Sequence, residues 1–175
     1  MKEIKRIFLV GFMGSGKSTL GRRLRTEMGW DFLDLDDVFE EKFKVKIKQY
    51  FSVHGEDAFR IAEKEVLKDV LDKERVIIAT GGGTPCFFDN MDVMNNNGLS
   101  IYLKLSVDVL IGRLSGGKQV RPLVAGKSGQ ELRDFICAKL QEREFFYNKA
   151  QVVADAEVLG VEAFVQIIEA SGKLI

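Results

Sequence analysis

The 175-residue sequence predicts an α/β fold, a three-layer sandwich in which a five-stranded parallel sheet carries helices on both faces. Two observations predict it. Short apolar segments alternate along the chain with longer segments whose apolar residues recur at helical spacing. The short segments are also continuously apolar, without alternating polar residues, and this is typical of strands that are buried on both faces.

The expected strands are short and end at glycine or polar residues. They cover residues 7–10, 32–33, 76–79, 101–105 and 151–154. The segment 76–79 is the most strand-like, because it reads Val-Ile-Ile-Ala and stops at Thr80 and three glycines. We expect these strands to follow one another through helical crossovers.

The expected helices follow the apolar spacing. Leu20, Leu24 and Met28 predict a first helix that ends near Gly29. Residues 47–53 predict a short helix or an irregular connection. Further helices are expected at about 56–73, 107–114 and 130–147, and from about 161. With no linker, repeat or low-complexity tract, residues 1–175 are expected to form a single domain.

Composition argues against several classes of protein. Hydrophobic residues make up 46% of the chain, and 26 basic residues balance 26 acidic ones, whereas a nucleic-acid-binding protein normally carries a basic excess. No apolar run approaches the roughly 20 residues that span a bilayer. Cys86 and Cys137 lack metal-site spacing, so we expect inert, buried or half-buried thiols in a reducing compartment. The sequence thus favours a cytoplasmic monomer that binds neither nucleic acid nor membrane.

Residues 11–18 fit the phosphate-loop pattern G-x-x-x-x-G-K-S/T without a mismatch. Glycines let successive backbone N–H groups face an anionic phosphate, and the following helix N-terminus favours it further. Lys17 can reach the β- and γ-phosphates of a nucleotide, and the Ser18 hydroxyl can bind Mg²⁺. We therefore expect a P-loop NTPase-type fold that binds ATP or GTP. The expected nucleotide-binding residues are Gly14, Ser15, Gly16, Lys17, Ser18 and Thr19.

Other motifs separate the phosphate-loop classes. A GTPase would show Asn-Lys-x-Asp near the end of a late strand, but residues 148–151 read Asn-Lys-Ala-Gln. Asp34 and Asp36 stand just past a strand, where ligands of parallel sheets bind. One of these carboxylates could orient the metal and the other could hold an acceptor hydroxyl. Alternatively, Asp34, Asp36 and Asp37 simply cap and begin the next helix.

The remaining motifs resemble those of the shikimate kinase family from about residue 7 to residue 150. They are Gly11–Ser18, Phe32-x-Asp34-x-Asp36 with Glu40, Phe51-x-x-x-Gly55-Glu56-x-x-Phe59-Arg60-x-x-Glu63, Gly81-Gly82-Gly83, Arg121-Pro122-Leu123, and Arg143 with Tyr147. The phosphate loop is widespread. The Phe-Arg-x-x-Glu, triple-glycine and Arg-Pro-Leu motifs in this order are much more specific to the family.

The resemblance implies ATP-dependent phosphorylation of a shikimate hydroxyl, with Mg²⁺, in aromatic amino-acid biosynthesis. It implies that Arg60, Arg143 and the glycines 81–83 bind shikimate, that Asp36 contacts the acceptor hydroxyl, and that Asp34 lies near Mg²⁺. Arg121 would be the arginine of a mobile lid at about 116–129, stabilising charge on the transferring group beside Lys17. Phe51 and Phe59 would line the substrate pocket.

Several alternatives stay open at this point. Arg60 could merely pair with Glu56 or Glu63 on its own helix, since those spacings bring side chains together. Arg113 could contact adenine. Phe145 replaces a proline that the family usually has two residues after the second substrate arginine, here Arg143. A kinase for another polyol acid such as gluconate, or a non-catalytic nucleotide-binding regulator, would share the phosphate loop.

Overall fold

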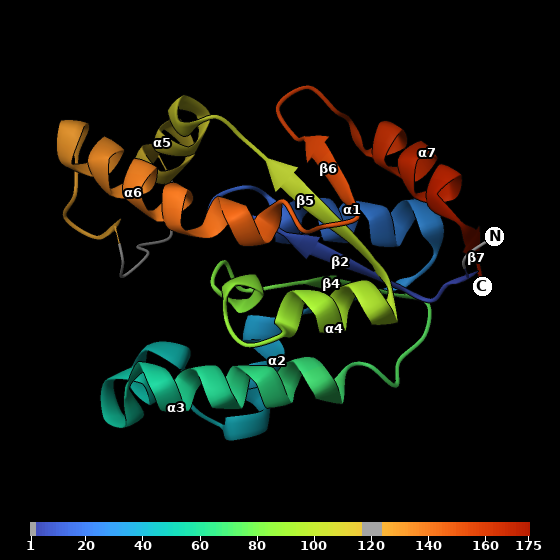
Figure 1. Ribbon diagram of the computed structural model, residues 1–175, viewed down its shortest axis with the longest axis horizontal. Helices are drawn as coiled ribbons and strands as arrows, with labels where there is room; N and C mark the ends of the chain where they lie inside the picture. Colours follow the sequence, from blue (N-terminus) through green and yellow to red (C-terminus); the bar gives the residue numbers. More distant parts are fainter. Residues whose placement is uncertain (1–2, 117–123) are drawn as a thin grey trace.

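The predicted parallel sheet is the centre of the structure, a computed structural model that describes residues 3–116 and 124–175 (Figure 1). Its five strands lie in the order β3-β4-β2-β5-β6, and every neighbouring pair is parallel. The strands are β2 (Arg6–Val10), β3 (Asp31–Asp34), β4 (Val76–Ala79), β5 (Leu99–Lys104) and β6 (Val152–Asp155). This arrangement confirms the predicted fold class.

Helices cover both faces of the sheet and form its outer layers (Figure 1). Helices α1 (Lys17–Met28) and α7 (Val161–Ser171) pack on one face. The other face carries α3 (Ile47–Asp69), α4 (Asn90–Asn97) and α6 (Gly129–Tyr147), with α2 (Leu35–Phe43) and α5 (Val107–Gly116) beside them.

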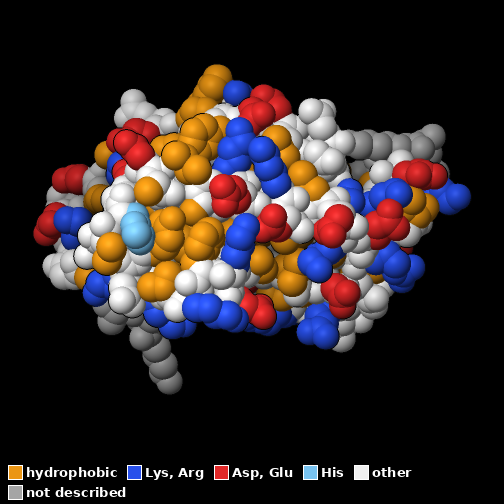
Figure 2. Space-filling view, turned by 90° about the horizontal axis from the view of Figure 1, so that it is seen from below, with side chains coloured by type: hydrophobic (Ala, Val, Ile, Leu, Met, Phe, Trp, Pro, Cys, Tyr) orange, Lys and Arg blue, Asp and Glu red, His pale blue; other side chains and the backbone are white. Residues whose placement is uncertain are grey.

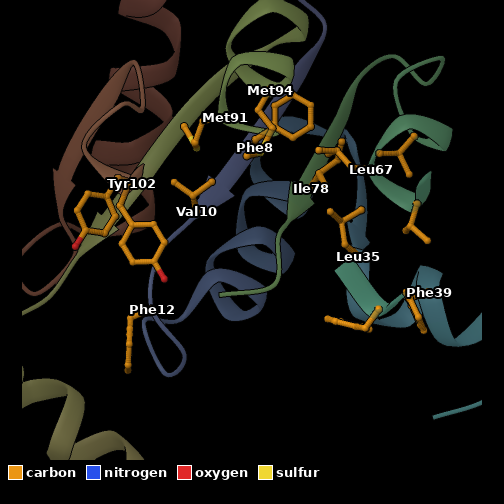
Figure 3. Close-up of a cluster of buried hydrophobic side chains, with 14 of the residues drawn as sticks. Phe8, Val10, Phe12, Leu35, Phe39, Leu67, Ile78, Met91, Met94 and Tyr102 are labelled. Carbon is orange, nitrogen blue, oxygen red and sulfur yellow. The ribbon is translucent and has the colours of Figure 1, made fainter. Parts of the chain in front are cut away.

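The central strand β2 divides its apolar side chains between these two layers. Phe8 and Val10 join a cluster with Ile78, Tyr102 and residues of α2, α3 and α4 (Figure 3), whereas alternate residues such as Leu9 join the cluster under α1 and α7. Successive side chains of a strand point to opposite faces. The uninterrupted apolar run therefore follows from burial on both faces.

The structure changes several predicted boundaries. Helix α3 joins the expected short helix at 47–53 to the expected helix from 56, with Gly55 at φ 79° and ψ 176° as a break between them, and it ends at Asp69 rather than near 73. Strand β5 begins at Leu99, two residues before the expected start. The 3₁₀ helix η1 (Thr84–Cys86) and helix α4 were not predicted, because neither has a sustained apolar period.

A second, two-stranded parallel sheet was also missed. Strand β1 (Glu3–Ile4) pairs with β7 (Lys173–Leu174), so the two ends of the described chain lie together (Figure 1). Two residues are too few to show a period in the sequence. Ile4 is buried in the same apolar cluster as α7, and this contact attaches the N-terminal segment to the last helix.

The register of the sheet gathers the loops that carry the candidate site. Ala79 of β4 lies opposite Leu9 of β2 on one side and opposite Asp34 of β3 on the other. The three strands therefore end at the same edge of the sheet. The phosphate loop after β2, the glycines after β4 and the carboxylates at the end of β3 lie there side by side, at the edge where ligands of open parallel sheets bind.

The packing of α1 on β3 depends on a helical glycine. A Cβ atom built on Gly21 would lie 2.2 Å from Cε2 of Phe32, whereas one built on Gly112 of α5 would meet nothing within 4 Å. Gly21→Ala should lower the free energy of unfolding by about 1–2 kcal/mol, because overpacking costs more than the helix propensity gained. Gly112→Ala should raise it by about 0.5–1 kcal/mol. Urea unfolding of both variants checks this, and equal stabilisation by the two substitutions would contradict the packing.

Candidate active site

The phosphate loop begins where β2 ends and leads directly into α1. Gly11, Gly14 and Gly16 have φ values of 149°, 80° and 93°, which side chains rarely adopt. The Ser15 amide donates to the Phe12 carbonyl over 3.1 Å and closes the turn. Gly16 is the N-cap residue of α1, so the positive end of the helix dipole faces the loop. This is an anion-binding geometry.

Lys17 is buried inside the loop. Its Nζ donates to the Gly11 and Phe12 carbonyls at 2.7 and 2.9 Å. The ammonium group is therefore held at the centre of the loop, close to where the loop amides converge. An incoming phosphate would exchange these carbonyl contacts for a charged partner.

Ser18 and Asp34 form an oxygen pair beside the loop. The Ser18 hydroxyl donates to Oδ2 of Asp34 over 2.5 Å, and Oδ1 of Asp34 accepts from the Asp36 amide over 3.1 Å. Asp34 therefore caps α2, as the capping interpretation predicts, and also contacts the residue that follows Lys17. Mg²⁺ in kinases binds few protein oxygens and completes its shell with water and phosphate. The pair fits such an ion.

The three glycines after β4 form the floor of a crowded cluster of charges. A Cβ on Gly83 would lie 2.6 Å from Nη2 of Arg60, and one on Gly82 would lie 3.5 Å from Nη1 of Arg143. A Cβ on Gly81 would lie 3.3 Å from Oδ1 of Asp36. The structure thus brings together the candidate substrate residues that the sequence placed on separate elements.

The two arginines differ in their partners. Nη1 of Arg60 donates to the buried Glu63 over 2.9 Å, and Nη2 donates to Glu56 over 3.2 Å. Its guanidinium also lies 4.1 Å from the centre of the Phe87 ring. Arg143, by contrast, forms no ion pair with any carboxylate in residues 3–116 or 124–175. A half-buried guanidinium without a carboxylate is suited to an anionic ligand.

Asp36 projects into this cluster. Its side chain keeps solvent contact at the mouth of the site, but the protein around the carboxyl group raises its pKa from 3.8 to about 6. Desolvation is the largest cause, followed by the negative charges of Asp34 and Glu63, while Lys17 acts in the opposite direction. At neutral pH the group is ionised and basic enough to accept a proton.

Comparison with known proteins agrees with this geometry. The family model described as shikimate kinase matches residues 13–171. A shikimate kinase of Parabacteroides distasonis is 47% identical over 165 residues, covering 94% of this chain and 95% of that protein. The chain belongs to the shikimate kinase family. It is therefore a phosphotransferase that uses ATP, and of the alternatives left open by the sequence the non-catalytic regulator is set aside.

Solved structures of shikimate kinases have the same fold. The crystal structure of the enzyme from Bacteroides thetaiotaomicron has a TM-score of 0.89 and 42% identity, and the match covers 95% of this chain and 97% of that one. A shikimate kinase of Acinetobacter baumannii, solved in complex with shikimate, has a TM-score of 0.84 and 29% identity, and the match covers 96% of this chain and 94% of that one.

The structure describes the remaining predicted residues to different extents. Arg121 and residues 117–123 of the expected lid lie outside the described residues. Phe59 is buried in the core, and Phe51 packs against its ring with 39% of its surface exposed. Thr19 is exposed on α1. Nη1 of Arg113 donates to the Ser15 carbonyl over 3.0 Å, so this arginine touches the phosphate loop itself.

The lone histidine and the two cysteines lie outside the phosphate loop. His54 is exposed and lies beside hydrophobic side chains (Figure 2), with its ring centre 4.5 Å from that of Tyr50. The cysteine prediction was half wrong. Cys86 is half-buried, and burial raises its thiol pKa to about 11, whereas Cys137 is exposed on α6. The apolar residues of α6 recur only weakly at helical spacing, so the sequence did not show that Cys137 faces solvent.

Sequence reasoning gave no role to two residues that build the site. The Tyr147 hydroxyl donates to the Gly82 carbonyl over 2.5 Å, which holds the glycine floor against α6. Thr84 is fully buried next to the glycines and donates to Glu63. Tyr147 stood in a recognised motif, and this was its only signal. Thr84 had none, because one threonine after a glycine run is an ordinary loop residue.

The raised pKa of Asp36 predicts a gain in stability on neutralising it. Its anionic form is disfavoured in the folded protein, so Asp36→Asn should raise the free energy of unfolding by about 1 kcal/mol at pH 7.5, after allowance for solvent screening. The gain should fall by about half by pH 5, because the folded wild type takes up its proton below pH 6.

Urea unfolding without Mg²⁺ or nucleotide measures this difference. Asp37→Asn is the matched control on the adjacent residue, in the first turn of α2, and should not stabilise the protein because it removes a carboxylate from a helix N-terminus. A loss of stability in Asp36→Asn at pH 7.5 would contradict the proposed charge crowding.

Proposed function

We propose that this chain transfers the γ-phosphoryl group of ATP to a ring hydroxyl of shikimate and forms shikimate 3-phosphate. The observation that carries the proposal is the triple-glycine floor, which lies against Arg60, Arg143 and Asp36 and borders the phosphate loop. A ligand on this floor would place its carboxylate at the two guanidinium groups. Its hydroxyl would face Asp36 and the nucleotide.

The nucleotide side of the reaction is assigned to the phosphate loop. The amides of Gly14, Ser15 and Gly16 would bind the phosphates at the N-terminus of α1, together with Lys17, Ser18 and Thr19. Lys17 neutralises charge on the β- and γ-phosphates. We assign Arg121 of the lid to the transferring group, where a guanidinium stabilises charge that develops in the transition state.

Mg²⁺ is assigned to the oxygen pair of Ser18 and Asp34. When bound, the ion supplies positive charge to the phosphates of ATP. The hydroxyl of Ser18 would bind it, and Asp34 would orient its water ligands while remaining the cap of α2. In residues 3–116 and 124–175 there is no group of three or more His, Cys, Asp and Glu side chains suited to a metal. A site completed by phosphate and water fits that finding.

We assign Asp36 the role of receiving the proton of the acceptor hydroxyl. An ionised carboxylate with a pKa of about 6 can hold the hydroxyl and receive its proton as the phosphoryl group transfers. Asp36 lies in the first turn of α2 beside Gly81, and its carboxylate would select which hydroxyl faces the nucleotide. Closure of the lid, about 116–129, would exclude the water that competes as acceptor.

The proposal extends to the setting of the enzyme. Residues 1–175 are taken as a single kinase domain that acts as a cytoplasmic monomer on small molecules, without nucleic acid or membrane. Both cysteines are unpaired, which suits a reducing compartment. No helix of the described segments is long and apolar enough to cross a membrane. Basic and acidic side chains are interspersed on the face in Figure 2, and the net charge is zero.

An ADP-release assay with MgATP tests the acceptor. Shikimate should stimulate release and gluconate should not. Arg60→Lys should lower kcat/KM for shikimate at least about tenfold, because lysine keeps a charge beside Glu63 but cannot make the bidentate contact. Arg23→Ala, a loss of charge on the exposed side of α1, should leave it unchanged. Stimulation by gluconate that Arg60→Lys does not affect would overturn the substrate assignment.

The magnesium assignment predicts a change in metal requirement. Asp34→Asn should raise the Mg²⁺ concentration for half-maximal activity about tenfold or more, because asparagine keeps the helix cap but loses the charge that orients the metal's waters. Asp31→Asn, at an exposed position of the same strand, is the matched control and should leave the requirement unchanged. Titration of activity with MgCl₂ at fixed ATP measures both, and superimposable curves would place the ion elsewhere.

A further inference from the structure

A buried polar cluster behind the glycine floor plays no part in the proposed mechanism. Glu63 of α3, Thr84 of η1 and Asn90 of α4 are 5%, 0% and 0% exposed. Buried polar groups are costly unless they are paired, so such a cluster calls for a structural or functional reason. These three residues come from separate elements and are joined through Thr84, which contacts both Glu63 and Asn90.

The two carboxylate oxygens of Glu63 accept hydrogen bonds from two different donors. Oε2 accepts from Nη1 of Arg60 over 2.9 Å, and Oε1 accepts from the Thr84 hydroxyl over 2.6 Å. With one oxygen held by each partner, the carboxylate has one orientation. Without Thr84 the carboxylate would keep only the contact with arginine, and the Arg60–Glu63 pair could turn as a unit.

Thr84 is itself fixed by the backbone. Its amide donates to the Gly81 carbonyl over 3.2 Å, and its carbonyl accepts from Nδ2 of Asn90 over 2.9 Å. A Cβ on Gly81 would lie 2.9 Å from the Thr84 hydroxyl oxygen. The turn that forms the glycine floor therefore also places this hydroxyl. Thr84 connects the floor to the arginine that lies across it.

We propose that Thr84 is a positioning residue for acceptor recognition: by donating its hydroxyl hydrogen to Glu63, it fixes the guanidinium of Arg60 over the glycine floor. The inference rests on the proposed function, in which Arg60 binds the acceptor carboxylate. Phe87 limits the guanidinium on one side at 4.1 Å, and Glu63 holds its edge. An arginine fixed in this way pays less ordering entropy when it binds a carboxylate.

Three substitutions at position 84 separate the hydroxyl from the packing. Thr84→Val keeps the shape and removes the donor, Thr84→Ser keeps the donor and removes a methyl group, and Thr84→Ala removes both. Steady-state kinetics should show that Thr84→Val raises KM for shikimate about five- to twentyfold, because a hydrogen bond to a charged group is lost. Its kcat and its KM for ATP should stay within about twofold. Thr84→Ser should restore KM for shikimate to within about threefold of the wild type.

A double-mutant cycle shows whether Thr84 acts through Arg60. In an Arg60→Lys background, Thr84→Val should have little further effect on KM for shikimate, because the guanidinium that it positions is absent. Full additivity of the two changes would overturn the proposal. If Thr84→Val does not fold, as judged by thermal unfolding, Thr84→Ala and Thr84→Ser form the same comparison, and equal KM values in that pair would overturn it.

Kinetics of the wild type separate a failure of the Thr84 proposal from a failure of the proposed function. If the wild type phosphorylates shikimate and Thr84→Val has the same KM, only the role of Thr84 falls. Parallel changes in kcat and in both KM values would also overturn it, since they indicate a general loss of structure. If the wild type does not phosphorylate shikimate, the proposed function falls, and the role of Thr84 falls with it.

Discussion

The position of β2 between β4 and β5 is the constraint on which the site depends. The parallel register, with Ala79 opposite both Leu9 and Asp34, brings the ends of β2, β3 and β4 to one edge of the sheet. Three loops that are distant in sequence become neighbours there. A one-residue slip in any of these strands would reverse its side chains and separate the groups.

The site gathers charges that cost stability when no ligand is bound. Desolvation and the negative charges of Asp34 and Glu63 raise the pKa of Asp36, and the positive charge of Lys17 offsets only part of this effect. Arg60 is held by two glutamates, whereas Arg143 has no carboxylate partner among the described residues. ATP, Mg²⁺ and an anionic acceptor supply the missing charges in the proposed complex. The unbound protein is thus prearranged for ligands that complete its charge balance.

Features could be predicted from the sequence where the residue types allow few backbone conformations or few patterns of burial. The phosphate-loop glycines and the five strands of the main sheet could be predicted, because positive φ values and double-sided burial leave few alternatives. The sequence left the contacts of Arg60 open, and the structure shows the intrahelical pairs together with a place on the glycine floor. Thr84, the break at Gly55 and the pairing of β1 with β7 could not be predicted, because each depends on contacts between distant segments.

The central claim is that the acceptor lies on the triple-glycine floor between the two arginines, with its reacting hydroxyl at Asp36. A crystal structure of this protein with ADP and shikimate tests it most directly. The account predicts the shikimate carboxylate within hydrogen-bond distance of both Arg60 and Arg143, and one ring hydroxyl within hydrogen-bond distance of the Asp36 carboxylate. A shikimate molecule bound away from the glycines, or turned so that its carboxylate faces Asp36, would contradict it.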